Sequence, residues 1–571
     1  MDDNSKDKDK PGLTRIAIAA HQACAAENLV RLDTTMAVDT AGGRIHVSWD
    51  ESGKMTGLGQ LPFFAEFLEF AQLFERWVET CPLHYHSNNA PAPRDVLGTW
   101  MLSVLEGHRR YAHVGSLRGD GVAPKILDME KIIGDESLRR ALAKIAPAPS
   151  PKHGEEQRLR QMSQLAAAEK WMDDSLLDSV KDALTIPWIL DVDTTIKTLY
   201  GQQSGAEVGY NAHKPGRPSH AIHTFWLGTL RLVLQAIVQG GKESSSAHTL
   251  PGLIELLLRL SPQQRPTLVR ADCGFGNEKV LCGLEELNQK YLIKLKQTAN
   301  VKAMIKEVMS HFRGATWCKA GQGWEATEST LKLLGWDHGR RVIVMRRVLK
   351  DVEAEPSNAG NKAKGKKKAK TKAKAKSAAG ATPQMCLQLA DANPAILNWE
   401  HAVLVTNSDM PVESMGQLYR DRADCENGFD ELKNQWGWGG YSTQDIERCN
   451  LSARAVALVH NWWSWYCRLA HPKARLEAVT SRPLLLGAVG KSIEHAGQHR
   501  MFVSILTGAA EKVKALTANI RAGLGHIRAT APQLKIGERW KALVTYIIEK
   551  IVAEMRKDAI NLPAPPNLTL G

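Results

Sequence analysis

Paired cysteines, long apolar runs and an apolar N-terminus are all lacking in this 571-residue chain. Its nine cysteines are scattered, with no C-x-x-C pair, which argues against a disulfide framework and a zinc ribbon and favours a reducing compartment. The first residues, MDDNSKDKDKPG, are polar and contain no secretory signal. The most apolar long window, 224–240, is interrupted by Arg231 and is unfit to span a bilayer. The sequence therefore predicts a soluble cytoplasmic protein with no membrane partner.

A general basic surface is also lacking, although the chain carries 74 Lys+Arg against 61 Asp+Glu and a formal net charge of +13. Nine lysines fall between residues 362 and 376, with no acid among them, and subtracting them leaves +4 for the rest of the chain. A tract of this composition cannot bury apolar surface. We expect a disordered loop at 358–381 and a folded body that is only mildly basic.

The length predicts three to five domains, and changes in pattern along the chain place their boundaries. Residues 1–59 read as a tail with a short helix at 15–30 and a hairpin arm at 36–50. A 3.6-residue apolar period makes 60–182 a helical region. The later regions are expected to be an α/β core in two parts, 183–298 and 399–470, a mainly β insertion at 299–398, and a C-terminal helical region at 471–571, with everything from 414 onward helical.

The α/β assignment comes from strands that alternate with helices between residues 187 and 296. PWILDVDTTIKTLYG, HTFWLGTLRLVLQAIVQGG, PTLVRADC and KYLIKLK read as strands, and LPGLIELLLRL and NEKVLCGLEELNQ read as helices. This rhythm is typical of a sheet with parallel strands. ATESTLKLL and RRVIVMRRVL then read as an antiparallel pair, and HAVLVTNSD as a returning core strand.

Acidic residues stand where such strands end. Asp193 closes the apolar strand core 187–193, and Asp272 follows the strand 266–271. Acids at strand ends face the crevice where open sheets bind ligands. Asp191 and Asp193 leave the same face of one strand, so the residue pattern does not choose between them.

A third acid lies on a predicted helix, SMGQLYRDRADCENGFDELKNQ. Tyr419, Arg422, Glu426 and Lys433 fall within an arc of roughly 60° on one face of that helix. Two cations, a phenol and a carboxylate on one stripe are not a core face. Asp430, one turn after Glu426, is the main rival to it as a ligand.

Three carboxylates from a sheet and an adjacent helix suit a pair of hard divalent ions, Mg²⁺ or Mn²⁺. Two such ions activate a nucleophile and stabilise the leaving oxygen during attack at phosphorus. Arg and Lys on the same stripe neutralise phosphate oxygens, and Tyr donates a hydrogen bond to one. The residues by themselves predict metal-dependent phosphoryl transfer.

Four segments make the chain resemble a bacterial insertion-sequence transposase with a DDE triad on an RNase H-like fold. They are ILDVDTT (189–195), GYNAHKPGRPSH (209–220), LVRADCGFGNE (268–278) and YRDRADCENGFDELK (419–433). The last matches the Y-x2-R-x3-E-x6-K signature of one cut-and-paste group at every spacing. The resemblance implies that Asp193, Asp272 and Glu426 are the catalytic, metal-binding acids, with Mg²⁺ as the natural ion and Mn²⁺ as a substitute.

The resemblance also implies partners. They are double-stranded DNA, comprising the element's terminal inverted repeats and target DNA, and a second copy of the chain in a synaptic complex on the bacterial nucleoid. Tyr419, Arg422, Lys433, Lys214 and Arg217 are the expected DNA-binding residues, and the helical region 60–182 is expected to bind DNA as well. In this group a mainly β insertion separates the second Asp from the Glu, here by 153 residues. One insertion tryptophan, Trp317, Trp324 or Trp336, is expected to stack on a flipped base.

Two alternatives stay open. Besides an active transposase, the chain could be a catalytically inactive, transposase-derived DNA-binding protein or a structure-specific RNase H-like nuclease without strand transfer. Elsewhere, Trp462, Trp463 and Trp465 are expected to be core residues of a helix under the sheet.

Overall fold

The computed structural model describes residues 35–211, 214–242, 245–310, 316–349, 399–441, 443–505 and 508–560. The helix expected at 15–30 and the lysine-rich loop expected at 358–381 lie outside these ranges. The chain divides into two compact units, residues 1–54 and 55–571.

The described part of the first unit is the hairpin predicted near 36–50. Strand β1 (Thr35–Thr40) pairs antiparallel with β2 (Gly43–Ser48). Gly43 after the turn has a φ of 109°, a conformation that a residue without a Cβ adopts freely. The predicted hairpin is confirmed.

The region from Leu61 to Asp178 is helical, as its apolar period predicts. Its helices are α2 (Leu61–Phe70), α3 (Leu73–Glu79), α4 (Pro93–Leu105), α5 (Ala123–Ile126), α6 (Asp135–Ile145) and α7 (Glu155–Asp178), with a 3-10 helix η1 (Tyr111–Leu117). These helices share one hydrophobic core with a long helix, α14 (Ile446–Ala470). Phe64 meets the ring of Trp463 edge-on at 5.1 Å, and Trp77 meets Trp462 at 5.7 Å.

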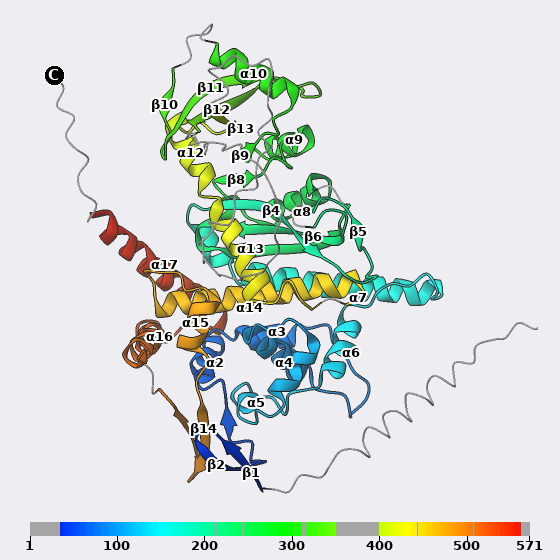
Figure 1. Ribbon diagram of the computed structural model, residues 1–571, viewed down its shortest axis with the longest axis vertical. Coiled ribbons are helices and arrows are strands. Elements are labelled where there is room, and N and C mark those ends of the chain that lie inside the picture. Colours follow the sequence, from blue (N-terminus) through cyan, green and yellow to red (C-terminus); the bar gives the residue numbers. More distant parts are fainter. Residues whose placement is uncertain are drawn as a thin grey trace, which may run out of the picture. The chain divides into compact units, whose positions relative to one another are not determined.

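The centre of the second unit is a ten-stranded mixed sheet (Figure 1). Its core strands are β4 (Ile189–Thr198), β6 (Pro218–Leu227), β7 (Leu232–Gly240), β8 (Leu268–Ala271) and β9 (Tyr291–Lys294). β4 is central, antiparallel to β6 and parallel to β8, while β7 extends the β6 side and β9 lies parallel to β8. The order β7-β6-β4-β8-β9 is that of an RNase H-like fold, so the predicted fold class is confirmed.

Two helices connect the core strands, and a short strand borders them. α8 (Ser245–Arg259) joins β7 to β8, and α9 (Glu278–Glu286) joins β8 to β9. The side chain of Asn277 accepts the N–H of Val280 and so caps the start of α9. β5 (Glu207–Val208) pairs with the beginning of β6.

The insertion continues the core sheet. β10 (Cys318–Lys319), β11 (Trp324–Leu331), β12 (Arg340–Val348) and β13 (Trp399–Thr406) form an antiparallel run, and the predicted pairing of the 326–334 and 340–349 segments is confirmed. β13 also pairs with β9, Leu404 opposite Lys294, and thereby joins the insertion strands to the core. A helix, α10 (Ala299–Met309), precedes these strands.

The expectation that everything after 414 is helical is wrong at one place. The helices are α12 (Val412–Arg420), α13 (Ala423–Gln435), α14, α15 (Ala478–Leu485), α16 (Ala510–Thr530) and α17 (Ile536–Ile560). Between α15 and α16, β14 (Gly490–His495) and β15 (Gln498–Val503) form a hairpin that also pairs with β3 (Met55–Thr56). Ala496 and Gly497 both have positive φ, which favours a two-residue hairpin turn over a helix.

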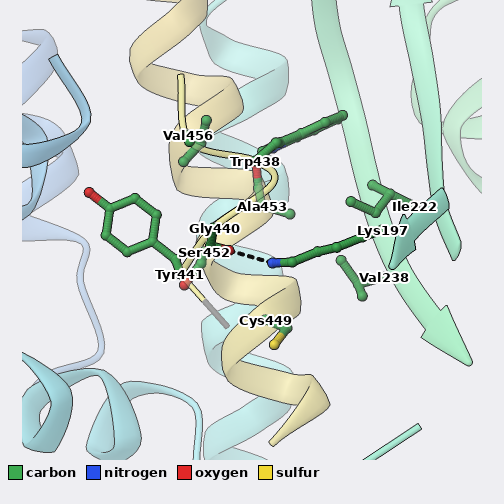
Figure 2. Close-up of a pocket in the computed structure, with 11 residues that line it drawn as sticks. Lys197, Ile222, Val238, Trp438, Gly440, Tyr441, Cys449, Ser452, Ala453 and Val456 are labelled. Carbon is green, nitrogen blue, oxygen red and sulfur yellow. Dashed lines mark hydrogen bonds between the residues drawn. The ribbon is translucent and has the colours of Figure 1, made fainter. Parts of the chain in front are cut away.

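Helix α14 packs against β7 and α7 (Figure 1). Its three tryptophans are buried as predicted. Beside it lies a cavity of about 10 Å³, roughly one water in size (Figure 2). Lys197 reaches into this space from β4 and donates to the carbonyl oxygen of Gly440. Burial raises the pKa of the Cys449 thiol in the same wall, but hydrogen bonding to His220 and the charge of Lys197 outweigh burial and bring it to about 7. Within the described ranges, none of the helices combines the length and apolarity needed to cross a bilayer.

Candidate active site

Two of the three predicted acids lie side by side where β8 ends. The last pair of the parallel β4–β8 ladder joins Val192 to Ala271. The next residue is Asp193 on β4 and Asp272 after β8. β4 itself continues to Thr198, as the strand predicted over PWILDVDTTIKTLYG requires, so Asp193 closes only the apolar core of its strand. What ends there is the neighbouring strand, and this opens one side of Asp193.

The structure separates the two acids that the residue pattern left open. Asp191 is fully buried, and both its oxygens accept hydrogen bonds of 2.7 Å from Arg270. Asp193 instead pairs with Arg422, with 2.6 Å between Oδ2 and the guanidinium nitrogen. Asp191 therefore has no oxygen free of Arg270 to offer a ligand, whereas Asp193 faces the helix that carries the signature.

That helix is interrupted. The sequence predicts one helix through the signature, but α12 ends at Arg420 and α13 begins at Ala423. The N–H of Arg422 donates to the carbonyl of Tyr419, three residues back, instead of continuing the four-residue ladder. The predicted single helix is wrong at this point.

The four signature side chains nevertheless gather around the acids. Burial raises the pKa of the Tyr419 phenol, and the charges of Asp272 and Asp193 raise it further. Burial lowers the pKa of Lys433, against the opposing charge of Asp193. Arg422 is buried in direct contact with Asp193, so the stripe faces the strand acids.

The electrostatics of Asp193 link it to the two other acids. Its burial raises the pKa to about 6, and the negative charges of Asp272 and Glu426 add to the rise while Arg422 opposes it. Like charges disfavour ionisation of a nearby carboxyl. A cation placed among the three would relieve that repulsion.

Asp430, the alternative ligand to Glu426, forms a hydrogen bond within its own helix, α13. Its Oδ1 accepts a 2.6 Å hydrogen bond from the amide of Asn434 one turn on. Glu426 and Asp430 are both exposed on α13, so the bond from Asn434 is what leaves Glu426 the freer of the two to reach a ligand.

The donor chemistry of the three acids suits a hard divalent ion, because all three offer carboxylate oxygens. In the described part of the chain, however, the group whose ligand atoms lie within 4.8 Å of one another is Glu278, Cys282 and Asp337. In that group Glu278 already accepts a 2.6 Å hydrogen bond from Arg340, which neutralises it. The carboxylates of Asp193, Asp272 and Glu426 lie farther apart than the ligand atoms of that group. Asp193 is also paired with Arg422.

The two loop cations predicted to bind DNA lie apart from the acids. Lys214 and Arg217 are exposed and surround the ring of Tyr200, at 4.9 and 5.6 Å from its centroid. Tyr200, on the connection before β5, is itself 68% exposed, and Tyr210, on the connection after β5 that also carries the two cations, is 77% exposed. The connections on either side of β5 thus present two cations and two aromatic rings to solvent, and the sequence analysis had named only the two cations.

The three candidate tryptophans of the insertion differ in exposure. Trp324 and Trp336 are buried, with Arg347 and Arg340 over their rings. Trp317 is partly exposed and stacks on Arg346, 3.7 Å from its ring centroid. Trp399, which the sequence reasoning missed, covers the same guanidinium at 4.4 Å.

A family model of known proteins matches most of this chain. The family model "Transposase DDE domain group 1" matches residues 70–489. No curated protein sequence matches the chain significantly. A matching solved structure is the cryo-EM structure of a piggyBac transposase synaptic complex with hairpin DNA, 9% identical, covering 90% of this chain and 83% of that chain with a TM-score of 0.35.

Proposed function

The chain belongs to the transposase DDE domain group 1 family, and on that premise we propose a DNA transposase that excises and reinserts an insertion sequence. Its substrates are the terminal inverted repeats of the element and a target duplex. Its reactions are metal-dependent strand cleavage and strand transfer.

The observation that carries the proposal is the meeting of three chain segments at Asp193. Asp193 and Asp272 lie together at the end of β8, and the charge of Glu426 acts on Asp193 from α13. We assign these three carboxylates to two divalent ions, Mg²⁺ naturally and Mn²⁺ as a substitute. When bound, the ions supply an activated nucleophile and a stabilised leaving oxygen.

The remaining signature residues have positioning and charge roles in this proposal. Arg422 balances the charge of Asp193 and is available to a phosphate oxygen once a metal takes its place. Lys433 supplies a second cation beside Asp193. Tyr419 keeps its proton because its pKa is raised, so the phenol donates a hydrogen bond to phosphate.

The wider assembly extends the proposal. Lys214 and Arg217 contact the DNA backbone from their exposed loop, and the helical region 60–182 also contacts DNA. Two copies of the chain hold two element ends in one synaptic complex. Trp317, the most accessible of the three insertion tryptophans, is the proposed stacking partner for a flipped base.

The test is cleavage of a duplex carrying the element end, with Mg²⁺ or Mn²⁺. Asp193→Asn, Asp272→Asn and Glu426→Gln should each abolish cleavage and leave DNA binding intact. Asp430→Asn, on the same helix, is the matched control and should cleave normally. Full activity in any of the three variants would refute that residue's assignment.

Two further outcomes separate the alternatives. Failure of the unaltered protein to cleave any end duplex with either metal would favour an inactive DNA-binding derivative. Cleavage that ignores the end sequence, with no product in a plasmid transposition assay, would favour a structure-specific nuclease.

A further inference from the structure

One buried side chain, Arg270 on β8, connects that strand to β4 and to the end of α12, the helix that precedes α13 and Glu426. It lies on β8 two residues before Asp272, and it is 3% exposed. Nε and Nη2 donate to the two oxygens of Asp191, each at 2.7 Å. Nη1 donates to the main-chain carbonyl of Leu418, at the end of α12.

The pair of Arg270 and Asp191 is in register with the acids. Asp191 and Arg270 are direct partners in the parallel β4–β8 ladder. Residues two apart on a strand share a face, so Asp193 and Asp272 lie on the same side as this pair. A bidentate arginine–carboxylate bond fixes both the distance and the orientation of its two partners. Here it holds β4 and β8 together two residues before Asp193 and Asp272.

The third bond explains the interruption in the signature helix. In an unbroken helix the N–H of Arg422 would donate to the carbonyl of Leu418. Here that N–H goes to Tyr419 instead, at 3.1 Å, and Arg270 takes the vacated carbonyl. The guanidinium thereby sits at the point where α12 gives way to α13, which sets the direction of α13 and with it the position of Glu426.

The surroundings are shaped for this arrangement. A Cβ added at Gly228 would lie 2.3 Å from Asp191 Oδ2 and 3.1 Å from Arg270 Nη2. The guanidinium fork, unlike a lysine ammonium, supplies donors in three fixed directions at once. In the sequence, Arg270 is the arginine of LVRADC, a residue to which the sequence analysis gave no role.

We infer that Arg270, with Asp191 as its anchor, is a positioning residue that sets the spacing of Asp193, Asp272 and Glu426 for metal binding. The inference rests on the proposed function. Arg270 contacts none of the reacting atoms and acts through β4, β8 and the α12–α13 junction.

The test replaces the ion pair by apolar residues, Asp191→Leu together with Arg270→Met. Exchanging a buried ion pair for apolar side chains of similar volume is often neutral for folding, but it removes the bond to Leu418. We expect normal DNA binding, a Mn²⁺ concentration for half-maximal cleavage at least about tenfold higher, and a maximal rate about 100-fold lower. Amide hydrogen exchange in 419–427 should be faster.

The matched control is a second, largely buried pair between α7 and α14, changed as Asp173→Leu with Arg454→Met; the Arg454 and Asp173 side chains are 6% and 16% exposed. It should leave the Mn²⁺ dependence and the exchange of 419–427 unchanged. Arg270→Lys is the second variant if the double substitution does not fold. It keeps the charge but cannot bond both Asp191 oxygens and Leu418 in the same geometry, so it should shift the Mn²⁺ dependence in the same direction.

Wild-type Mn²⁺ dependence in the folded double variant, or in Arg270→Lys, would overturn the inference. If the unaltered protein itself shows no metal-dependent cleavage, the proposed function fails and the exchange measurement alone decides. Unchanged exchange of 419–427 in the double variant would then refute the positioning role.

Discussion

Removing the guanidinium of Arg422 should change how protons compete with metal for Asp193. In the metal-free protein the Asp193 pKa is about 6, because burial and two neighbouring acids raise it while Arg422 holds it down. The two groups are 2.6 Å apart and both are buried. Arg422→Met removes the largest influence that favours the carboxylate.

The expected size follows from the geometry. An opposite charge at this distance lowers a carboxyl pKa by about 1–3 units, so its loss should raise the Asp193 pKa from about 6 by that amount. Metal binds the carboxylate and not the acid. In the wild type, apparent Mn²⁺ affinity should be constant above the pKa and weaken about tenfold per pH unit below it.

The assay measures Mn²⁺ binding without DNA at a series of pH values from about pH 5 to about pH 8. The concentration of free Mn²⁺ is detected by electron paramagnetic resonance. In Arg422→Met the point where affinity begins to fall should move upward by about 1–3 pH units. At any pH above its raised Asp193 pKa the variant should bind at least as tightly as the wild type, since no guanidinium competes for Asp193. Arg420→Met, whose native side chain bonds Ala320 instead, is the control and should keep the wild-type profile.

Two results would refute this reasoning. One is a wild-type affinity that does not change across the range, since Asp193 would then not titrate near 6. The other is an Arg422→Met profile that breaks at the wild-type pH. Uniformly weaker binding at every pH would indicate damage to the site and not a shifted carboxyl.

Three further predictions concern folding and charge. Gly228→Ala should lower the free energy of unfolding by about 1–3 kcal/mol in a urea titration, because its Cβ would overlap Asp191; an unchanged midpoint would contradict the tight packing there. Asn461→Leu should cost about 1–3 kcal/mol for each backbone group of Val233 left unpaired, since the amide bonds both its N–H and its C=O; wild-type thermal stability would show that water replaces it. Deleting 361–378 should flatten the salt dependence of DNA binding and spare cleavage; lost cleavage at low salt would refute a purely electrostatic role.

Much of the fold was predictable because its signals are local. The 3.6-residue period identified the helices of 60–182, and β-branched runs identified β4, β8, β9 and β13. The Y-x2-R-x3-E-x6-K spacing singled out Glu426 over Asp430, and the hydrogen bond from Asn434 to Asp430 agrees with that choice.

Two local predictions of secondary structure were wrong, and each error has a physical cause. The hairpin β14–β15 was missed because its short strands depend on a turn with positive φ at Ala496 and on pairing with β3, a distant segment. The break in the signature helix was missed because the Arg side chain that stabilises it comes from β8, 148 residues earlier in the chain.

By itself, the sequence determined the family-defining spacing and the residue types at the site, because both are properties of neighbouring positions. Only the tertiary structure decided that Asp191 is held by Arg270 while Asp193 faces Arg422. That distinction depends on strand register between segments 79 residues apart, which no local period encodes. The same register gives Arg270 its bond to Leu418, and so connects the two strand acids to the helix that carries the third.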